Sequence, residues 1–567
     1  MNKRYLKIRL SQLNLFVGNF EYNFKKIKEA ILKGREERVD IIAFPELSIT
    51  GYPPEDLLYK KVFIKDNIKY LNKIKRYCKD IICIVGFVNK IKSDIFNSAA
   101  VIYNNSIVAI YNKINLPNYS VFDERRYFKE GKSIPLFYLG NIRFGLSICE
   151  DIWVANPPLI EEKRYGDIDF LININASPYY QNKYKERLKL LKKLAKKNNL
   201  TIAYLNMVGG QDEIVFDGNS MVVNEKGKLI ANGYSFKEDN VDFYIEEKRD
   251  KNPIKRIKSI KFFNIPYNFK NFNIEKEKYI LRDIDKEEKE VYNALVLGTR
   301  DYIWKNGFKK VLIGLSGGID SALTTLVAVD AIGSDNVITI FMPSQFSSNE
   351  SYIDAKKLAK NVNVEFHILT IKEIYKKYLK ILEPLFSGKP FNIAEENIQA
   401  RIRGNLLMAI SNKFGYLVLT TGNKSEMSTG YSTLYGDMAG GFAVIKDVYK
   451  SMVYKLAKYR NKVAGYDIIP ENILIKEPTA ELRENQKDSD SLPPYEILDK
   501  ILYYYIEKHL SYKDIVKKGF REDEVKRAIY LVDRNEYKRR QAPPGVKITK
   551  LALGKDRRFP ITNGYKI

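Results

Sequence analysis

The fold of the second half is decided by the stretch VLIGLSGGIDS, residues 311–321. Its first five residues are mostly apolar and predict a buried parallel strand, whereas residues 321–332 have the pattern of a helix. Glycines in the intervening turn let backbone N–H groups approach an anion closely, and the helix N-terminus adds unpaired donors and a positive dipole end. Asp320 suits a Mg²⁺ ion that accompanies phosphate. The stretch therefore predicts a site for a pyrophosphate group.

The turn is not that of an ordinary P-loop ATPase. A Walker A loop has a lysine directly after its second glycine, and here Ile319 follows Gly318. The string Ser316-Gly-Gly-Ile-Asp-Ser321 resembles instead the PP-loop of the ATP pyrophosphatases, which cleave ATP to AMP and pyrophosphate to adenylate a substrate. The alternative is a strand-to-helix turn in which the glycines only permit tight packing. The six-residue string is far more specific than a glycine pair and favours the PP-loop.

Length and composition limit the class of protein. A chain of 567 residues, 45% hydrophobic and 29% charged, predicts two to four globular domains. The net charge of +26 comes from lysines interleaved with acidic residues, which is typical of a solvated surface, so we expect no nucleic-acid partner. The sequence has no apolar run long enough for a membrane span and no signal-peptide pattern after Met1. We expect a cytoplasmic protein with no membrane partner.

Histidine and cysteine counts exclude several chemistries. The chain has two histidines, His367 and His509, and three cysteines, Cys78, Cys83 and Cys149. Histidine scarcity argues against Cys–His and Ser–His–Asp catalysis and against histidine-based metal sites. The odd cysteine number gives no disulfide framework.

The two halves differ in their predicted order of strands and helices. Residues 1–250 alternate strands and helices, with short turns that indicate a mixed sheet. Expected strands are 6–15, 41–44, 81–88, 99–103, 107–111, 142–148, 170–174, 202–205 and 220–223; expected helices are 24–34, 64–78 and 183–197. Residues 251–284 are polar and without period and are predicted to be a linker. Residues 285–567 predict a doubly wound parallel sheet, mostly helical after residue 446, with its nucleotide at the carboxyl ends of the strands.

Three expected strands of the first half end near a reactive side chain. The reactive residues at these strand ends are Glu46, Lys113 and Cys149. A carboxylate can take the thiol proton, and an ammonium can lower the thiol pKa and stabilise an oxyanion. A cysteine at a strand end is on its own more often a small core residue, so the prediction depends on the three together.

The strings around these residues, 41–54, 111–125 and 143–153, resemble the nitrilase (carbon–nitrogen hydrolase) superfamily. That resemblance covers roughly the first 240 residues and implies an α-β-β-α sandwich, with Glu46 as general base, Lys113 as oxyanion-stabilising cation and Cys149 as nucleophile. Leu116-Pro-Asn-Tyr119 and Asn175-Ala-Ser177-Pro-Tyr are similar to segments of its glutaminase members. The glutamine contacts implied by this likeness are Tyr119, Ser177 and Lys183.

Strings downstream of the PP-loop, at 397–405, 419–428 and 430–441, are together similar to the NAD synthetase domain, an adenine nucleotide alpha hydrolase-like fold. The resemblance implies ATP contacts at Gly314, Leu315, Ser316, Gly317, Gly318, Ile319, Asp320, Ser321 and Thr421. It implies Mg²⁺ ligands at Asp320 and Glu426, and deamido-NAD contacts at Asn397, Glu426, Asp437, Lys446 and Lys538.

The combination resembles the glutamine-dependent NAD synthetases. It implies a ligase that hydrolyses glutamine to ammonia and uses ATP to adenylate and amidate deamido-NAD, with AMP and pyrophosphate as products. Another glutamine-dependent ATP-pyrophosphatase amidotransferase, acting on a different carboxylate or a nucleobase, is the alternative. A nucleic-acid-binding protein is the contrasting class. The expected partners are small molecules, and the resemblance implies a homo-oligomer.

Overall fold

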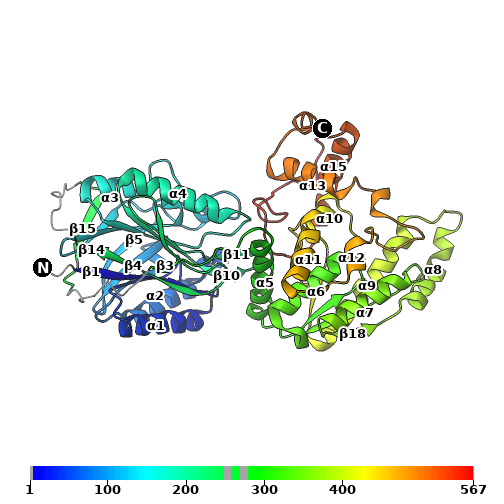
Figure 1. Cartoon of the computed structure of the whole chain (residues 1–567), viewed down its shortest axis with the longest axis horizontal. Helices are drawn as coiled ribbons and strands as arrows, with labels where there is room; N and C mark the ends of the chain where they lie inside the picture. The colour runs from blue at the N-terminus through cyan, green and yellow to red at the C-terminus, as the bar shows by residue number, and fades with distance from the viewer. Residues whose placement is uncertain (1–3, 248–256, 268–278, 566–567) are drawn as a thin grey trace. The chain divides into compact units, whose positions relative to one another are not determined.

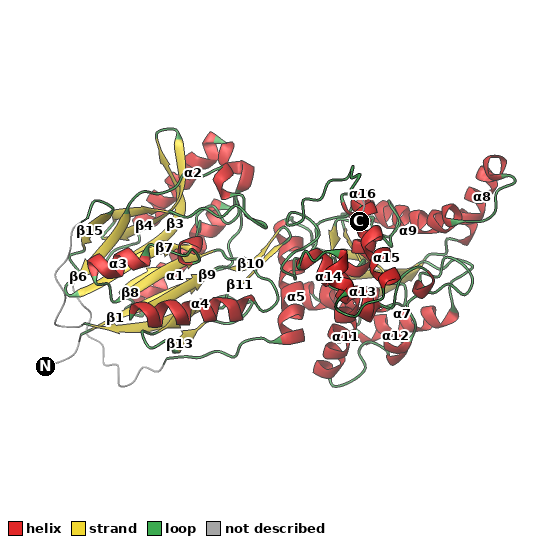
Figure 2. Ribbon diagram, turned by 90° about the horizontal axis from the view of Figure 1, so that it is seen from above, coloured by secondary structure: helices red, strands yellow, loops and turns green. Residues whose placement is uncertain are grey.

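The computed structural model describes residues 4–247, 257–267 and 279–565. Its chain separates into two compact units, coloured blue to green and green to red in Figure 1. The first comprises Met1–Gln211 and Val215–Asp285, and the second Asp212–Ile214 and Lys286–Ile567. Figure 2 distinguishes the strands of both units, in yellow, from their helices, in red.

Two sheets build the first unit. One has six strands in the order β14 (Asp239–Glu246), β1 (Tyr5–Gln12), β2 (Ile41–Ala43), β3 (Ile82–Ile91), β4 (Asp94–Tyr103) and β5 (Ser106–Asn112). The other has seven in the order β13 (Leu229–Asn232), β12 (Met221–Val223), β9 (Thr201–Asn206), β8 (Phe170–Asn175), β7 (Ile142–Ile148), β6 (Ile134–Leu139) and β15 (Ile260–Asn264). A separate hairpin joins β10 (Val208–Gln211) and β11 (Ile214–Asp217).

Alternating side chains of both sheets form the core between them. Leu6, Ile8 and Leu10 of β1 share one buried cluster with Phe144 and Leu146 of β7, as expected for strands that point every second residue to one face. The outer layers are the helices α1 (Phe20–Glu36), α2 (Lys61–Lys75), α3 (Leu159–Gly166) and α4 (Lys183–Asn198). α3 and α4 bury a second cluster against the outer face of the seven-stranded sheet, and α2 packs on β3 and α1. These layers are the predicted α-β-β-α sandwich.

The predicted strands and helices of this half all exist, but the sequence pattern missed several further elements. The missed strands are β6, β10, β11, β13, β14 and β15, and the missed helix is α3. β15 lies inside the predicted linker and pairs in parallel with β6, from Ile260 opposite Ile134 to Asn264 opposite Tyr138. Its five residues are bordered by polar, lysine-rich sequence, so they gave no detectable period. Residues 251–256 and 268–278 of that linker lie outside the described residues, and the domain boundaries remain a prediction.

The second unit contains a five-stranded, fully parallel sheet. Its order is β18 (Glu365–Ile368), β17 (Val337–Phe341), β16 (Val311–Gly314), β19 (Leu417–Thr420) and β20 (Phe442–Ala443). The chain order reverses between β16 and β19, so this is the predicted doubly wound sheet. Ligands of such sheets bind beyond the carboxyl ends of the strands at this point of reversal. The turn after β16 is the predicted PP-loop.

Helices surround this sheet. Those of the unit are α5 (Glu287–Lys305), α6 (Ile319–Ile332), α7 (Asn349–Asn361), α8 (Lys372–Phe386), α9 (Ile393–Phe414), α10 (Lys424–Thr429), α11 (Lys450–Ala464), α12 (Glu471–Ile475), α13 (Tyr495–Leu502), α14 (Tyr512–Val516), α15 (Glu522–Arg534) and α16 (Glu536–Arg539). α8 and α9 bury apolar residues with Leu312 and Ile338, whereas α6 and α7 contact β17 and α5 packs on α6. Among the described residues, no helix is both long and apolar enough to cross a membrane.

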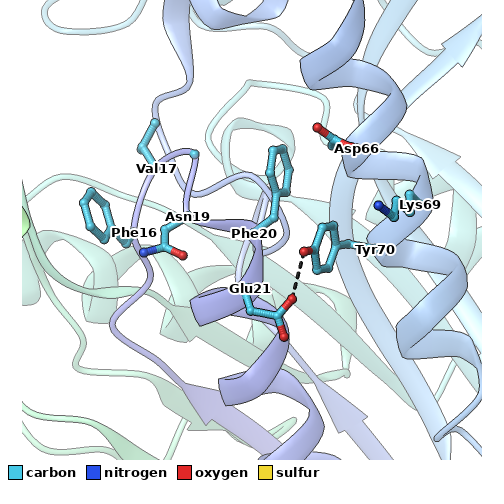
Figure 3. Close-up of a pocket in the computed structure, with 9 residues that line it drawn as sticks. Phe16, Val17, Asn19, Phe20, Glu21, Asp66, Lys69 and Tyr70 are labelled. Carbon is cyan, nitrogen blue, oxygen red and sulfur yellow. Dashed lines mark hydrogen bonds between the residues drawn. The ribbon is translucent and has the colours of Figure 1, made fainter.

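One shallow pocket of the first unit lies where α1 begins (Figure 3). Phe20 stacks on Tyr70 of α2 with 5.5 Å between ring centroids, and the Tyr70 hydroxyl donates to Glu21 over 2.8 Å. The nine residues that line it belong to α1, α2 and the turn before α1, and none is a predicted site residue.

Candidate active sites

The predicted catalytic residues of the first unit stand just after three strands. Glu46 follows β2, Lys113 follows β5 and Cys149 follows β7. Glu46 and Lys113 are fully buried, and Cys149 is 3% exposed. Lys113 Nζ donates to Glu46 Oε1 over 2.7 Å, and the N–H of Ala176 donates to Glu46 Oε2 over 2.9 Å. The structure thus joins the general base and the cation that the sequence predicted.

Cys149 has a strained backbone and a thiol whose pKa is raised. Its φ of 42° lies in the left-handed region, a conformation that persists in a non-glycine residue only where the surroundings enforce it. Burial raises the pKa of the thiol, the Glu46 charge raises it further, and the Lys113 charge lowers it, leaving the pKa well above its usual value. The thiol therefore needs a base to ionise, and Glu46 is a carboxylate close enough to act on its charge.

Glu124 belongs to this site and was missed by the sequence reasoning. Its Oε1 accepts from Lys113 Nζ over 2.9 Å and from the Tyr52 hydroxyl over 3.0 Å. Burial raises the pKa of Glu124, the Lys113 charge lowers it and the Glu46 charge raises it, with the outcome at about 7. Glu124 lies within the string 111–125 that carries Lys113, so an acidic residue eleven positions after the lysine was an available signal.

The residues that directly follow Cys149 meet two of the predicted glutamine contacts. The Tyr119 hydroxyl donates to Glu150 Oε2 over 2.9 Å. Lys183 is the first residue of α4, and its Nζ lies 4.1 Å from the centroid of the Trp153 ring. Glu150 and Trp153 were quoted in the cysteine string but received no role from the sequence.

Ser177 follows β8, the parallel neighbour of β7, so it lies at the same sheet edge as Cys149. Its carbonyl and hydroxyl oxygens accept from Arg187 Nη2 over 2.8 and 3.2 Å. Arg187 is fully buried and pairs with Asp217 over 2.6 Å, which fixes the serine.

The second unit has a cavity of about 400 Å³ beyond the ends of β16 and β19. The predicted residues that line it are Gly314, Leu315, Ser316, Gly317, Gly318, Ile319, Asp320, Ser321, Asn397, Thr421, Glu426, Asp437 and Lys538. The cavity therefore collects the predicted ATP and deamido-NAD residues with one exception, Lys446.

Backbone geometry shapes the PP-loop. Gly317 has a φ of 81°, and a Cβ at this position would lie 2.3 Å from the Ser351 carbonyl oxygen. Both the left-handed backbone and the close approach of α7 thus require glycine. The Ser321 hydroxyl donates to the Gly318 carbonyl over 2.9 Å and accepts from the Ser316 N–H over 3.2 Å. These hydrogen bonds to the loop backbone stabilise the conformation of the loop.

Lys450, the first residue of α11, joins the two predicted metal ligands. Its Nζ lies 2.5 Å from Asp320 Oδ2 and 3.4 Å from Glu426 Oε1. Burial and the Asp320 charge raise the pKa of Glu426 to about 8, although the Lys450 charge opposes them. Glu426 is oriented by a capping box with Asn423, the N-cap of α10. Sequence reasoning missed Lys450 because that region read simply as helical.

The remaining predicted deamido-NAD residues are joined through the glycine-rich loop after α10. The Thr433 hydroxyl donates to Asn397 Oδ1 over 2.7 Å, and the Thr433 N–H donates to Asp437 Oδ1 over 2.6 Å. Lys538 Nζ donates to the Gly430 carbonyl over 2.7 Å. Burial raises the pKa of Asp437 to about 6.

Lys446 was predicted as a further contact, but its ammonium is engaged elsewhere. Its Nζ donates to the Pro543 carbonyl over 2.7 Å, and the side chain is buried. The lysine that faces the cavity from this region is Lys450, four residues later. Lys446 lies in the turn between β20 and α11, so no strand or helix period indicated the direction of its side chain.

A second buried lysine ties α10 to the C-terminal segment. Lys424 Nζ is 0% exposed and lies 2.9 Å from Asp447 Oδ1 and 3.1 Å from Glu507 Oε1. It also donates to Thr549 Oγ1 over 2.6 Å and to the Leu551 carbonyl over 3.0 Å. The helix that carries Glu426 is therefore anchored by residues near the chain end.

Two family models match the chain, one in each unit. The carbon-nitrogen hydrolase model matches residues 7–243, and the NAD synthase model matches residues 291–542. Glutamine-dependent NAD(+) synthetases of Thermotoga maritima and Aquifex aeolicus are 46% and 47% identical to it, each over 99% of this chain and over 99% and 100% of their own lengths. The chain belongs to the glutamine-dependent NAD(+) synthetases.

Solved structures of such synthetases cover the whole chain. That from Acinetobacter baumannii, in complex with adenosine diphosphate, is 42% identical over 99% of both chains, with a TM-score of 0.76. That from Cytophaga hutchinsonii is 22% identical over 99% of this chain and 98% of its own, with a TM-score of 0.81, and shows the shared fold. The synthetase family predicted from the sequence and its two-part fold are confirmed.

Proposed function

We propose that this synthetase forms NAD in two chemical steps, with glutamine hydrolysis in the first unit and amidation of deamido-NAD in the second. The observation that carries the proposal is the division of side chains between two sites. A buried thiol with a carboxylate and an ammonium stands in one unit, and a glycine-rich anion cradle facing a 400 Å³ cavity stands in the other. Each site suits one half of the reaction and lacks the groups for the other half.

In the first step Glu46 takes the proton of Cys149, and the thiolate attacks the side-chain amide carbon of glutamine. Lys113 stabilises the negative charge that develops on the amide oxygen. The C–N bond then breaks, the proton passes from Glu46 to the leaving nitrogen, and ammonia departs from a glutamyl thioester. Water hydrolyses the thioester to glutamate, with Glu46 again as the base.

The charged ends of glutamine need partners beyond the reacting amide. Lys183 suits the α-carboxylate, and Ser177 and Tyr119 add hydroxyl groups. Glu150 suits the α-ammonium, because its carboxylate is already held by the Tyr119 hydroxyl next to Cys149. These contacts select an amide that carries both charges of an amino acid.

In the second step the PP-loop residues from Gly314 to Ser321, with Thr421, hold ATP. Backbone N–H groups of the loop and the first turn of α6 face the pyrophosphate that leaves when the nicotinate carboxylate of deamido-NAD is adenylated. Asn397, Glu426, Asp437 and Lys538 line the part of the cavity left for deamido-NAD. Ammonia then displaces AMP from the acyl adenylate and forms the amide.

Asp320 and Glu426 fit a magnesium ion. Their carboxylates converge on one ammonium, that of Lys450, so they can converge on a cation. Two carboxylates suit Mg²⁺, an ion that takes much of its coordination from water and substrate phosphates. Bound there, the ion would neutralise charge on the pyrophosphate.

A second copy of the chain is the partner that the second unit suits. α8, the start of α9 and the segment between them present exposed apolar side chains, namely Tyr378, Ile381, Leu385, Phe391 and Ile393. Ile393 is 66% exposed and also lines the cavity. Exposed patches of this kind mark interaction surfaces.

We place the enzyme in the cytoplasm, because Cys149 must remain a reduced thiol.

The proposal is tested by assaying deamido-NAD, ATP and glutamine together for NAD, AMP and glutamate. Cys149→Ala should abolish NAD formation from glutamine and leave NAD formation from ammonium chloride within about twofold, since the second unit would be intact. A folded Cys149→Ala variant that loses both activities would refute the division into two sites. Asp320→Asn should reduce both activities and leave glutamine hydrolysis without ATP unchanged.

A further inference from the structure

The nucleophile and the oxyanion-stabilising lysine come from different sheets. Lys113 follows β5 at the edge of the six-stranded sheet, and Cys149 follows β7 inside the seven-stranded sheet. Their relative placement matters, because a misplacement of about 1 Å between reacting groups can slow catalysis about 100-fold. A polar connection between the two strand ends would fix their register.

Asp151 makes that connection. Its Oδ2 accepts from the Tyr111 hydroxyl over 2.7 Å and from the Ile148 N–H over 3.0 Å. Its Oδ1 accepts from the N–H of Asn115 over 2.8 Å and from Asn115 Nδ2 over 3.1 Å. Tyr111 and Asn115 stand two residues before and two residues after Lys113, whereas Ile148 directly precedes Cys149. The fully buried carboxylate therefore holds both segments at once.

The bond from Ile148 has a further effect on the nucleophile. It spans Cys149, whose φ of 42° is unfavourable for a residue with a side chain. Such a conformation persists only where the surrounding structure supports it. The Asp151 carboxyl oxygen supplies an acceptor for the Ile148 N–H at the strained turn.

We propose that Asp151 is a positioning residue of the glutaminase site, which holds the Cys149 turn and the Lys113 segment in catalytic register. The proposal rests on the proposed role of Cys149 and Lys113. Asp151 touches neither residue's reacting atom, so it would act on the rate of thioester formation through geometry. Binding of glutamine, which uses other residues, would change little.

Asp151→Asn tests this with little change of shape. If the amide nitrogen takes the place of Oδ2, the Tyr111 hydroxyl can turn and accept, but the Ile148 N–H loses its acceptor. If the amide is flipped, its nitrogen faces both donors of Asn115. Tyr111→Phe removes a single bond on the Lys113 side. Glu162→Gln is the matched control, because Glu162 is also fully buried and accepts one bond, from the Leu146 N–H over 3.2 Å.

For Asp151→Asn we expect kcat of glutamine hydrolysis to fall roughly 10- to 100-fold, with KM changed less than about threefold. Alkylation of Cys149 by iodoacetamide should become slower, because Glu46 would no longer be placed to take the thiol proton. Tyr111→Phe should lose about three- to tenfold in kcat, and Glu162→Gln should match the wild type. NAD formation from ammonium should stay within about twofold in all three variants.

A folded Asp151→Asn enzyme with kcat within twofold of wild type and an unchanged rate of Cys149 alkylation would overturn the proposal. Equal loss of the glutamine- and ammonium-driven activities would also overturn it, since that is the result of general destabilisation. If Asp151→Asn does not fold, Tyr111→Phe decides by the same criteria. Cys149→Ala, measured in parallel, distinguishes failure of this proposal from failure of the glutaminase assignment itself.

Discussion

The two sites of this chain differ in how much open space surrounds their charged groups. In the first unit Lys113, Glu46 and Glu124 are buried against one another, and each compensates a neighbour within 3 Å. In the second unit the catalytic space is a 400 Å³ cavity, whose lining combines the backbone and small side chains of the PP-loop with cations such as Lys450 and Lys538. A covalent nucleophile acting on a small amide benefits from a buried, closely packed setting, whereas two large anionic substrates need room and many donors. Four variants test this difference.

The largest effect is expected for Lys113→Met. It removes the cation and leaves two buried carboxylates uncompensated, so glutamine-driven NAD formation should fall by at least about 1,000-fold, while ammonium-driven formation stays within a few-fold. Lys424→Met is the matched control, because Lys424 is equally buried and also pairs with two carboxylates, but in the second unit. It should lower the melting temperature and leave glutamine hydrolysis unaffected. Equal glutaminase rates in both variants would remove the distinction between the two buried lysines.

Gly317→Ala should reduce NAD formation from either nitrogen source by roughly 100-fold, because its Cβ would meet the Ser351 carbonyl and displace the PP-loop by enough to spoil its geometry. Gly307→Ala is the control that separates the effect of a left-handed backbone from that of a steric clash. Gly307 has a nearly identical φ of 79°, and a Cβ there meets nothing within 4 Å. Kinetics with both nitrogen sources should show wild-type rates for Gly307→Ala. Full activity in Gly317→Ala would mean that the loop does not need its close approach to α7.

A smaller effect is expected from Glu124→Gln on the pH dependence of stability. Burial raises the folded-state pKa of Glu124 from 4.5 to about 7, so the folded state holds this proton more tightly than the unfolded state. The stabilisation is complete below about pH 4.5 and is lost as pH rises through 7. The melting temperature of wild type relative to Glu124→Gln should therefore fall by roughly 3–6 °C between pH 5 and 7.5. A difference that stays constant with pH would contradict the raised pKa.

The smallest effect is expected at the exposed rim of the first site. Tyr119→Phe removes the hydroxyl that donates to Glu150, and one partly solvated hydrogen bond contributes about 1 kcal/mol. The KM for glutamine should rise about two- to fivefold at unchanged kcat. Tyr505→Phe, which removes a similar bond to Asp533 in the second unit, should leave this KM unchanged. A large loss of kcat in Tyr119→Phe would place the hydroxyl closer to the chemistry than the structure does.

The sequence predicted those parts of the sites that one segment encodes. Glu46, Lys113 and Cys149 each follow a recognisable strand, and Gly314 to Ser321 form one turn, so their positions could be read from local pattern. Glu124 and Lys450 were missed, because their importance comes from meeting residues more than ten positions away, across strands or helices. Lys446 was predicted by resemblance as a deamido-NAD contact; its ammonium donates to the Pro543 carbonyl, and the contact stays a prediction. β15 was not predicted because a strand of five residues has too few alternating positions for its pattern to be recognised.

The Lys424 anchor has a consequence for the order in which the enzyme becomes functional during its synthesis. Thr549 and Leu551, which receive the Lys424 ammonium, follow it by 125 and 127 residues. A chain emerging from the ribosome can complete the sandwich of the first unit long before those residues appear, since domains fold as units from the N-terminus. Until then Lys424 lacks these two acceptors, and α10, with Glu426, is not fully secured. Glutaminase competence should thus arise on nascent chains that cannot yet use the ammonia, and a stalled or trimmed C-terminus would leave an enzyme that wastes glutamine.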